Sequence, residues 1–199
     1  MLIFLDFFGT IIFALTGVLV AYKSDMDIFG ALVLATITAI GGGTVRDILL
    51  GLEPFWMKDV IYLYVIAGTT ILSFILITWI EKIPPKSLEV ADAIGLATFT
   101  ITGISIAQTV HTSETVCVMM GIITAVAGGA VRDVLSNRIP IVLNGRGFYA
   151  TASLIGGGLG LSLQGFFSLP IIYTIIGGTT LLLRLLSIHN LLFVPTFRK

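Results

Sequence analysis

Two short stretches of this sequence place glycines and a charged pair inside segments that are otherwise apolar. The first is Ile40–Leu50, which reads IGGGTVRDILL, and the second is Val126–Leu135, which reads VAGGAVRDVL. Glycine weakens a helix, and an ionisable side chain in hydrocarbon is costly enough that it usually serves a function. Because both features occur twice at one spacing, the sequence indicates a membrane transport protein built by duplication.

The charged pairs of these stretches are Arg46 with Asp47 and Arg132 with Asp133. Neighbouring residues on a helix do not face each other, so we expect each arginine to need a further carboxylate. An earlier apolar segment carries an aspartate at the matching depth in each case. In order of expectation, the candidate partners are Asp6 and Asp92, then Asp47 and Asp133. The alternative is that these charges extend to the lipid headgroups and do nothing more.

The glycines of the two motifs are Gly41, Gly42 and Gly43 in the first copy and Gly128 and Gly129 in the second. The first three lie about 10–14 Å from the end of their apolar segment at the helical rise, and therefore near the middle of the membrane. A break or kink there would expose backbone groups, which is tolerated only against protein or a wet cavity. The alternative is close helix packing. Duplication together with the Arg-Asp pair favours the break or kink.

A Thr-Gly pair also recurs in the middle of two apolar segments, at Thr16 and at Thr102. Threonine hydroxyls at this depth could supply oxygen ligands to a cation that is losing its water. They could equally bond to carbonyl groups of their own helix. The spacing leaves both interpretations open.

The composition identifies lipid as the solvent of this chain. Hydrophobic residues make up 56% and charged residues 11% of the 199 residues, and the mean hydropathy is +1.07. Soluble domains are about 25% charged. The net charge of zero argues against nucleic acid as a partner. The sequence contains no metal-ligand, nucleotide-binding or catalytic motif, so we expect neither an enzyme nor a cofactor nor a fixed metal.

Seven segments are apolar over about 20 residues, the length that crosses a bilayer. They are residues 2–22, 28–50, 60–80, 91–110, 115–135, 148–167 and 169–187. Loop charges orient them, because lysine and arginine gather on the cytoplasmic side. One side carries Lys23, Lys82, Lys86, Arg138, Arg146, Arg198 and Lys199, and the other carries Lys58. The N-terminus is therefore expected outside and the C-terminus in the cytoplasm.

Residues 6–54 align without a gap to residues 92–140 and share 16 of 49 positions. The identities include charged and proline positions, which shared apolar composition would not match in register. Each unit contains three spans, so the second unit enters the membrane from the opposite side. This predicts an inverted-topology repeat with its pathway near the midplane. The expected fold is a single all-α integral membrane domain over 1–199: one repeat over 1–85, a second over 86–168, and a seventh helix and tail over 169–199.

With GGGTVRD in the second span, AGGAVRD in the fifth and a seventh helix outside the repeat, the chain resembles the prokaryotic trimeric intracellular cation (TRIC) channels. That sequence family also contains small bacterial inner-membrane proteins classed as glycine transporters. The resemblance covers essentially the whole chain. It implies a homotrimer in a prokaryotic inner membrane with one potassium-permeable pore in each protomer, lined by second and fifth helices that are kinked at their glycines. One departure is Ala127, where the first copy has glycine.

Three functions follow from these observations. The leading hypothesis is a channel for monovalent cations, with potassium as the first candidate ion and sodium as the second. In such a channel the aspartates would neutralise the arginines, and the arginines would hold the kinks in place or form a gate. The second is a secondary transporter for glycine or another small zwitterion, in which arginine and aspartate bind carboxylate and ammonium. The third is a membrane scaffold or lipid-binding protein that transports nothing. Membrane lipids are expected partners in every case.

Overall fold

The computed structural model describes residues 2–76, 84–110, 112–143 and 147–192. The fold of these residues is all-helical, with eight α-helices and one short 3-10 helix. The elements are α1 (Leu2–Tyr22), α2 (Ile28–Leu49), α3 (Phe55–Lys58), α4 (Ile61–Ile75), α6 (Pro85–Thr109), α7 (Glu114–Leu135), η1 (Ile141–Leu143), α8 (Ala150–Ser162) and α9 (Leu169–Ile188).

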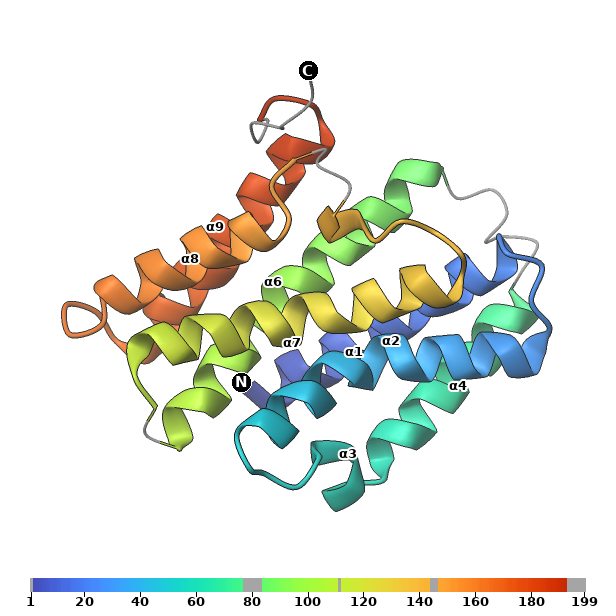
Figure 1. The fold of residues 1–199 in the computed structure, drawn as a ribbon, viewed down its shortest axis with the longest axis horizontal. Coiled ribbons are helices and arrows are strands. Elements are labelled where there is room, and N and C mark those ends of the chain that lie inside the picture. Colours follow the sequence, from blue (N-terminus) through green and yellow to red (C-terminus); the bar gives the residue numbers. More distant parts are fainter. Residues whose placement is uncertain (1, 77–83, 111, 144–146, 193–199) are drawn as a thin grey trace.

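Four long helices form the centre of the molecule: α1, α2, α6 and α7 (Figure 1). Within this group α1 packs on α2 and on α6, and α7 packs on α2 and on α6. The shorter α4 covers one side by packing on α1 and α2. On the other side, α8 and α9 lie together against α6 and α7 (Figure 1). The centre therefore holds the two segments that carry the duplicated motifs.

Five of the described helices are long and apolar enough to cross a membrane, namely α1, α2, α6, α7 and α9. This establishes a membrane-type helical fold. The two remaining candidates, α4 and α8, contain 15 and 13 residues. The count of seven spans therefore stays a prediction.

Several expected boundaries differ from those observed. The span expected at 60–80 is helical over Ile61–Ile75, and 77–83 lie outside the described residues. The span expected at 148–167 ends at Ser162, shortly before Gly165, whose φ of 110° is incompatible with a helix. The span expected at 91–110 begins earlier, at Pro85, because proline suits the first turn of a helix.

The duplicated glycines lie where α2 crosses α7. A Cβ atom on Gly42 would collide with the carbonyl oxygen of Thr124, and one on Gly128 would collide with the carbonyl oxygen of Thr38. Both helices run without interruption through their motifs. The expected break is therefore wrong, and close packing explains Gly42 and Gly128. A kink without a break stays a prediction.

A second close contact joins α1 and α6 in the core. The rings of Phe13 and Phe99 meet edge to face with their centroids 4.9 Å apart. A Cβ atom on Gly95 would collide with the Phe13 ring, and one on Gly9 would lie 3.1 Å from the Phe99 ring. These residues are also paired by the sequence alignment, so matched positions of the two units meet at the centre of the fold.

Candidate functional site

Arg46 is bound by its neighbour in the sequence. Its Nε donates to Oδ1 of Asp47 at 2.8 Å, and its Nη2 lies 2.8 Å from the same oxygen. The expectation that adjacent residues cannot satisfy each other is wrong here. The arginine side chain is long enough to fold back to the carboxylate, and both side chains are buried at the end of α2.

The Asp47 carboxylate also fixes the chain that follows α2. Its Oδ2 accepts a hydrogen bond from the backbone N–H of Phe55 at 2.9 Å. One residue further on, the indole N–H of Trp56 donates to the hydroxyl of Thr44 at 3.0 Å. The short helix α3 is thereby held against the end of α2. Phe55 and Trp56 are half-buried here.

The second motif makes the same contacts. Arg132 Nε donates to Oδ1 of Asp133 at 2.9 Å, and Arg132 Nη2 lies 2.8 Å from that oxygen. The Oδ2 atom of Asp133 accepts from the backbone N–H of Ile141 at 3.1 Å. Each Arg-Asp pair therefore ties the end of a central helix to the segment that follows it.

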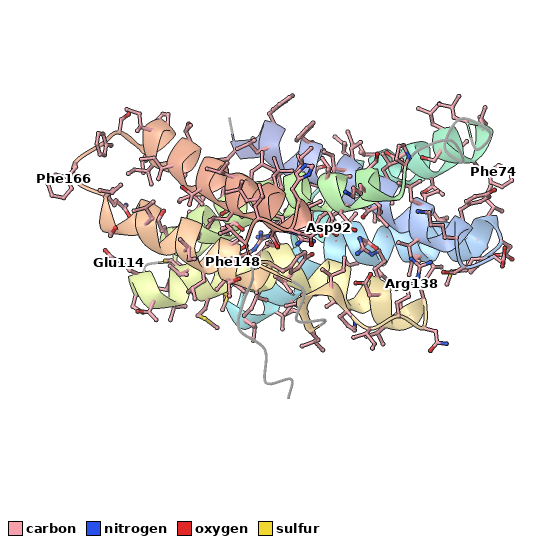
Figure 2. The ribbon with its side chains drawn as sticks, turned by 90° about the horizontal axis from the view of Figure 1, so that it is seen from above. Phe74, Asp92, Glu114, Arg138, Phe148 and Phe166 are labelled. Atoms are coloured by element: carbon pink, nitrogen blue, oxygen red, sulfur yellow. The ribbon has the colours of Figure 1, made fainter. Side chains whose placement is uncertain are left out.

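Arg132 makes two further contacts that Arg46 lacks among the described residues. Its Nη1 donates to Asp92 Oδ1 at 3.0 Å and to the hydroxyl of Thr16 at 3.0 Å. One side chain thus joins α7 to α6 and α1 at a point where Asp92 is fully buried. Figure 2 shows Asp92 in the interior of the bundle, between the ends marked by Phe166 and Phe74. This is the pairing expected from their common depth.

Asp6 has a different partner from the one expected. Its Oδ2 accepts a hydrogen bond of 2.6 Å from the hydroxyl of Tyr62, which belongs to α4. The ion pairs of the described residues do not include one between Asp6 and Arg46. Because Asp47 already occupies Arg46, the Asp6 carboxylate is free to accept from tyrosine. The Tyr62 ring is fixed between Phe7, at 4.4 Å, and Phe55, at 4.6 Å between centroids.

Tyr149, immediately before α8, lies beside the Asp92 carboxylate. A Cβ atom on Gly129 would lie 3.2 Å from the Tyr149 hydroxyl and 3.7 Å from Asp92 Oδ1. The guanidinium carbon of Arg184 lies over a face of this ring, 5.0 Å from the ring centroid. Gly129 therefore makes room for a tyrosine next to the charged cluster, as Gly43 makes room for Phe55 in the first copy.

The two candidate threonines both bond to their own helix. Thr16 donates to the carbonyl of Phe13 at 2.9 Å, and Thr102 lies 3.5 Å from the carbonyl of Phe99. Thr16 also accepts from Arg132. The back-bonding interpretation therefore describes this structure for both, and their role towards an ion stays a proposal.

Two cavities reach these clusters. The Asp6 cavity has a volume of about 260 Å³, and its polar lining consists of Asp6, Tyr62, Thr102 and Ser105. The Tyr149 cavity has a volume of about 470 Å³, and its polar and charged lining includes Lys23, Lys86, Glu89, Tyr149, Arg184 and Ser187. One cavity is therefore lined by a carboxylate and hydroxyls, and the other is rich in basic side chains.

The cavities lie at opposite ends of the α1–α6 pair. The Asp6 cavity is lined by the first turns of α1 and by the C-terminal half of α6. The Tyr149 cavity is lined by Lys23, just beyond the end of α1, and by the first turns of α6. Between them lie Thr16 and its donor Arg132. Along both helices the charged cluster therefore lies between the two cavities.

Sequence reasoning missed the tyrosines and Arg184. Tyr62 and Tyr149 each lie near the start of the third helix of a unit, but the alignment of the two units ends at Pro140 and does not pair them. An alignment extended with a one-residue gap would have matched them. Arg184 carries no motif around it in the sequence, and its side chain is buried in the fold. No group of three or more metal-ligating side chains occurs among the residues that were described.

The sequence model of the family described as glycine transporter matches residues 3–78 and 89–165. The chain belongs to this family. The two matched segments together span more than half of the chain, and each corresponds to one of the two aligned units. This assignment agrees with the sequence analysis, in which the chain resembles TRIC channels and a family that also contains proteins classed as glycine transporters.

Relatives and solved structures agree with this assignment. The UPF0126 inner membrane protein YadS of Escherichia coli strain K12 is 43% identical over 196 residues, covering 97% of this chain and 94% of that protein. A UPF0126 membrane protein of Vibrio cholerae is also 43% identical, covering 99% of this chain and 83% of that protein.

The structure of the TRIC channel orthologue from Rhodobacter sphaeroides is 32% identical with a TM-score of 0.88, covering 94% of this chain and 97% of that one. A second TRIC cation channel structure has a TM-score of 0.87. These family members are membrane proteins, and the matched structures are channels and not enzymes.

Proposed function

We propose that this protein is a potassium-permeable channel for monovalent cations, with one pore in each protomer. The observation that carries the proposal is the pair of cavities at opposite ends of α1 and α6, with the Arg132–Asp92–Thr16 cluster between them along these helices. Matched structures described as TRIC cation channels support the same function.

The pathway would run between the two three-helix units. The proposal treats α4 and α8 as the short third spans of two inverted repeats, with α9 as a seventh span. Reciprocal contacts between matched glycines support this arrangement, because Gly42 meets α7 where Gly128 meets α2. A modest kink of α2 and α7 at these glycines would widen the path without breaking either helix. The hydroxyls of Thr16 and Thr102 would then face the ion.

The arginines are compatible with a cation path because carboxylates neutralise them. Asp47 pairs with Arg46, and Asp133 together with Asp92 pairs with Arg132. A neutralised arginine raises no net electrostatic barrier, whereas an unpaired one would repel cations. In the observed arrangement Arg132 bridges three helices, so we interpret the structure as a closed pathway whose opening requires this bridge to move.

The proposed assembly and location rest on how two similar proteins are described. The TRIC channel matched from Rhodobacter sphaeroides is described as trimeric, and the matched Escherichia coli protein is described as an inner membrane protein. We propose a homotrimer in a prokaryotic inner membrane. The loop charges support an N-terminus outside and a C-terminus in the cytoplasm, and in this orientation the Asp6 cavity would open outward and the Tyr149 cavity inward.

Glycine transport is the second candidate, and the description of the matching family favours it. A site with arginine and aspartate side chains close together can bind a carboxylate and an ammonium group.

A flux measurement separates the two functions. Purified protein in liposomes is assayed for potassium, sodium and radiolabelled glycine in one preparation. Rapid, non-saturating potassium flux without glycine uptake supports the channel, and saturable glycine uptake with little passive potassium flux overturns it.

A further inference from the structure

Arg184 is a buried cation without a counter-ion among the described residues. It lies in the last turns of α9 and is 4% exposed. The ion pairs of the described residues include Arg46 and Arg132 but not Arg184. Its Nε atom is buried and has no hydrogen-bond acceptor in the part of the chain that the structure describes. The face of the Tyr149 ring is the contact that holds it.

A buried guanidinium in this state is unfavourable. Burying a charge is costly unless the charge is paired and hydrogen-bonded. A ring face attracts a cation, but it offers no acceptor to the N–H groups in the guanidinium plane. Arg46 and Arg132 illustrate the usual solution, since each is met by carboxylate oxygen at 2.8 Å. Arg184 requires an acceptor of the same kind.

The cavity beside Arg184 has the charge and the size to supply that acceptor from outside the chain. Lys23 and Lys86 line the same cavity, and Glu89 is the acidic side chain among its lining residues. With Arg184 this gives three positive charges against one negative charge. Neither lysine is in an ion pair with any described residue. A cavity of about 470 Å³ accommodates a small anion with its water.

We propose that the Tyr149 cavity is a binding site for an oxyanion, a carboxylate or phosphoryl group, that pairs with Arg184. The planar guanidinium matches two oxygens of such a group. Lys23 and Lys86 add attraction at the mouth, and the Ser187 hydroxyl, which accepts from the backbone N–H of Phe148 at 3.0 Å, has its own hydrogen to donate. The group can arrive on a free anion or on the headgroup of an anionic lipid.

An anion bound at this site would act on the proposed ion pathway by way of Tyr149. This ring has Arg184 on one face and Asp92 beside its hydroxyl. A bound oxyanion cancels the positive potential of the cavity, through which a cation would otherwise have to pass. The effect on conduction depends on the proposed channel function, but the binding does not, so the two are tested separately.

The test measures binding without flux. Full-length protein in nanodiscs of zwitterionic lipid is titrated with inorganic phosphate and, separately, with acetate, and the thermal unfolding midpoint is followed, because a ligand of the native state raises it. Chloride at equal ionic strength is the reference. A second set of nanodiscs contains anionic lipid in place of added anion. The variants are Arg184→Met, Lys23→Gln with Lys86→Gln, and Lys58→Gln as the matched control for an exposed lysine elsewhere.

Two results would support the site. A rise of the midpoint with phosphate or acetate over chloride that is lost in Arg184→Met and kept in Lys58→Gln assigns it to free oxyanions. A rise that occurs only with anionic lipid and has the same variant pattern assigns it to headgroups. The double lysine variant should need at least tenfold more anion. This variant keeps the test valid if Arg184→Met does not fold, since both its lysines are exposed. A midpoint that responds equally to chloride, or an anion response unchanged in the double lysine variant, would overturn the proposal.

Discussion

The guanidinium of Arg132 lies 3.0 Å from the carboxylate of Asp92, and the side chains of both are almost fully excluded from solvent. In the first unit the matching aspartate, Asp6, accepts from Tyr62 instead. The two halves therefore share a sequence motif but use it differently. Arg132 joins α7 to α6 and α1, whereas in the first half a neutral hydroxyl donates to the aspartate.

Asp92→Asn is expected to destabilise the protein more than Asp6→Asn. The first change weakens a buried hydrogen bond between two charged groups, which is worth about 1.5–3 kcal/mol, while Asp133 still pairs with Arg132. The second change keeps an acceptor for the Tyr62 hydroxyl and is expected to cost about 1 kcal/mol. Thermal unfolding of both variants in the same detergent measures the difference.

The two aspartates are a matched pair, since each lies at the same position of its unit. Equal unfolding midpoints for the two variants would show that the Arg132–Asp92 contact carries no special stability. The interpretation that the Arg132 bridge holds the three helices together would then be wrong.

Gly128→Ala is expected to destabilise the α2–α7 crossing. The added Cβ atom would collide with the carbonyl oxygen of Thr38, and backbone cannot move aside as a flexible side chain can. Overpacking of this kind costs about 1–3 kcal/mol. Gly68→Ala is the control, because a Cβ atom there meets nothing within 4 Å and alanine favours the helix. A loss of stability in the control that equals the loss in Gly128→Ala would contradict the close-packing explanation.

The sequence predicts the centre of the molecule well, because its features are local or repeated. Apolar length identifies the five long helices, and the alignment pairs Gly42 with Gly128 and Phe13 with Phe99, which meet in the fold. The depth of a residue in the membrane also follows from its position along an apolar segment, so Arg132 could be matched with Asp92. These predictions need only the period of a helix and the order of the segments.

Contacts that depend on side-chain reach were predicted less well. Arg46 folds back to Asp47, because a long side chain is not bound by the direction of its Cα–Cβ bond. The position of Tyr62 depends on how α4 packs on α1, which the sequence of either helix alone does not determine. The burial of Arg184 likewise results from the packing of α9 on α6 and α8.

Arg46→Ala is expected to increase potassium flux. The guanidinium carbon of Arg46 lies 5.7 Å from the centroid of the Phe55 ring, and Phe55 lines the Asp6 cavity. Removing this charge leaves the Asp47 carboxylate without its ion-pair partner near the proposed path, which favours cations there. A barrier lower by about 1 kcal/mol corresponds to about a fivefold faster flux. Liposome flux measures it, with Lys58→Ala as the control for loss of an exposed charge. Unchanged flux in Arg46→Ala would exclude a role of this arginine in conduction or gating.

Tyr62→Phe is expected to increase potassium flux while the fold is retained. The change removes the hydroxyl that donates to Asp6 at 2.6 Å and keeps the ring between Phe7 and Phe55. The Asp6 carboxylate is then free to attract a cation into its cavity. The control is Tyr64→Phe, on the same helix and 73% exposed. Flux should rise severalfold in Tyr62→Phe alone, and the rise should disappear in the double variant with Asp6→Asn. A rise that persists without the carboxylate would show that Tyr62 restricts the path by its size and not by holding Asp6.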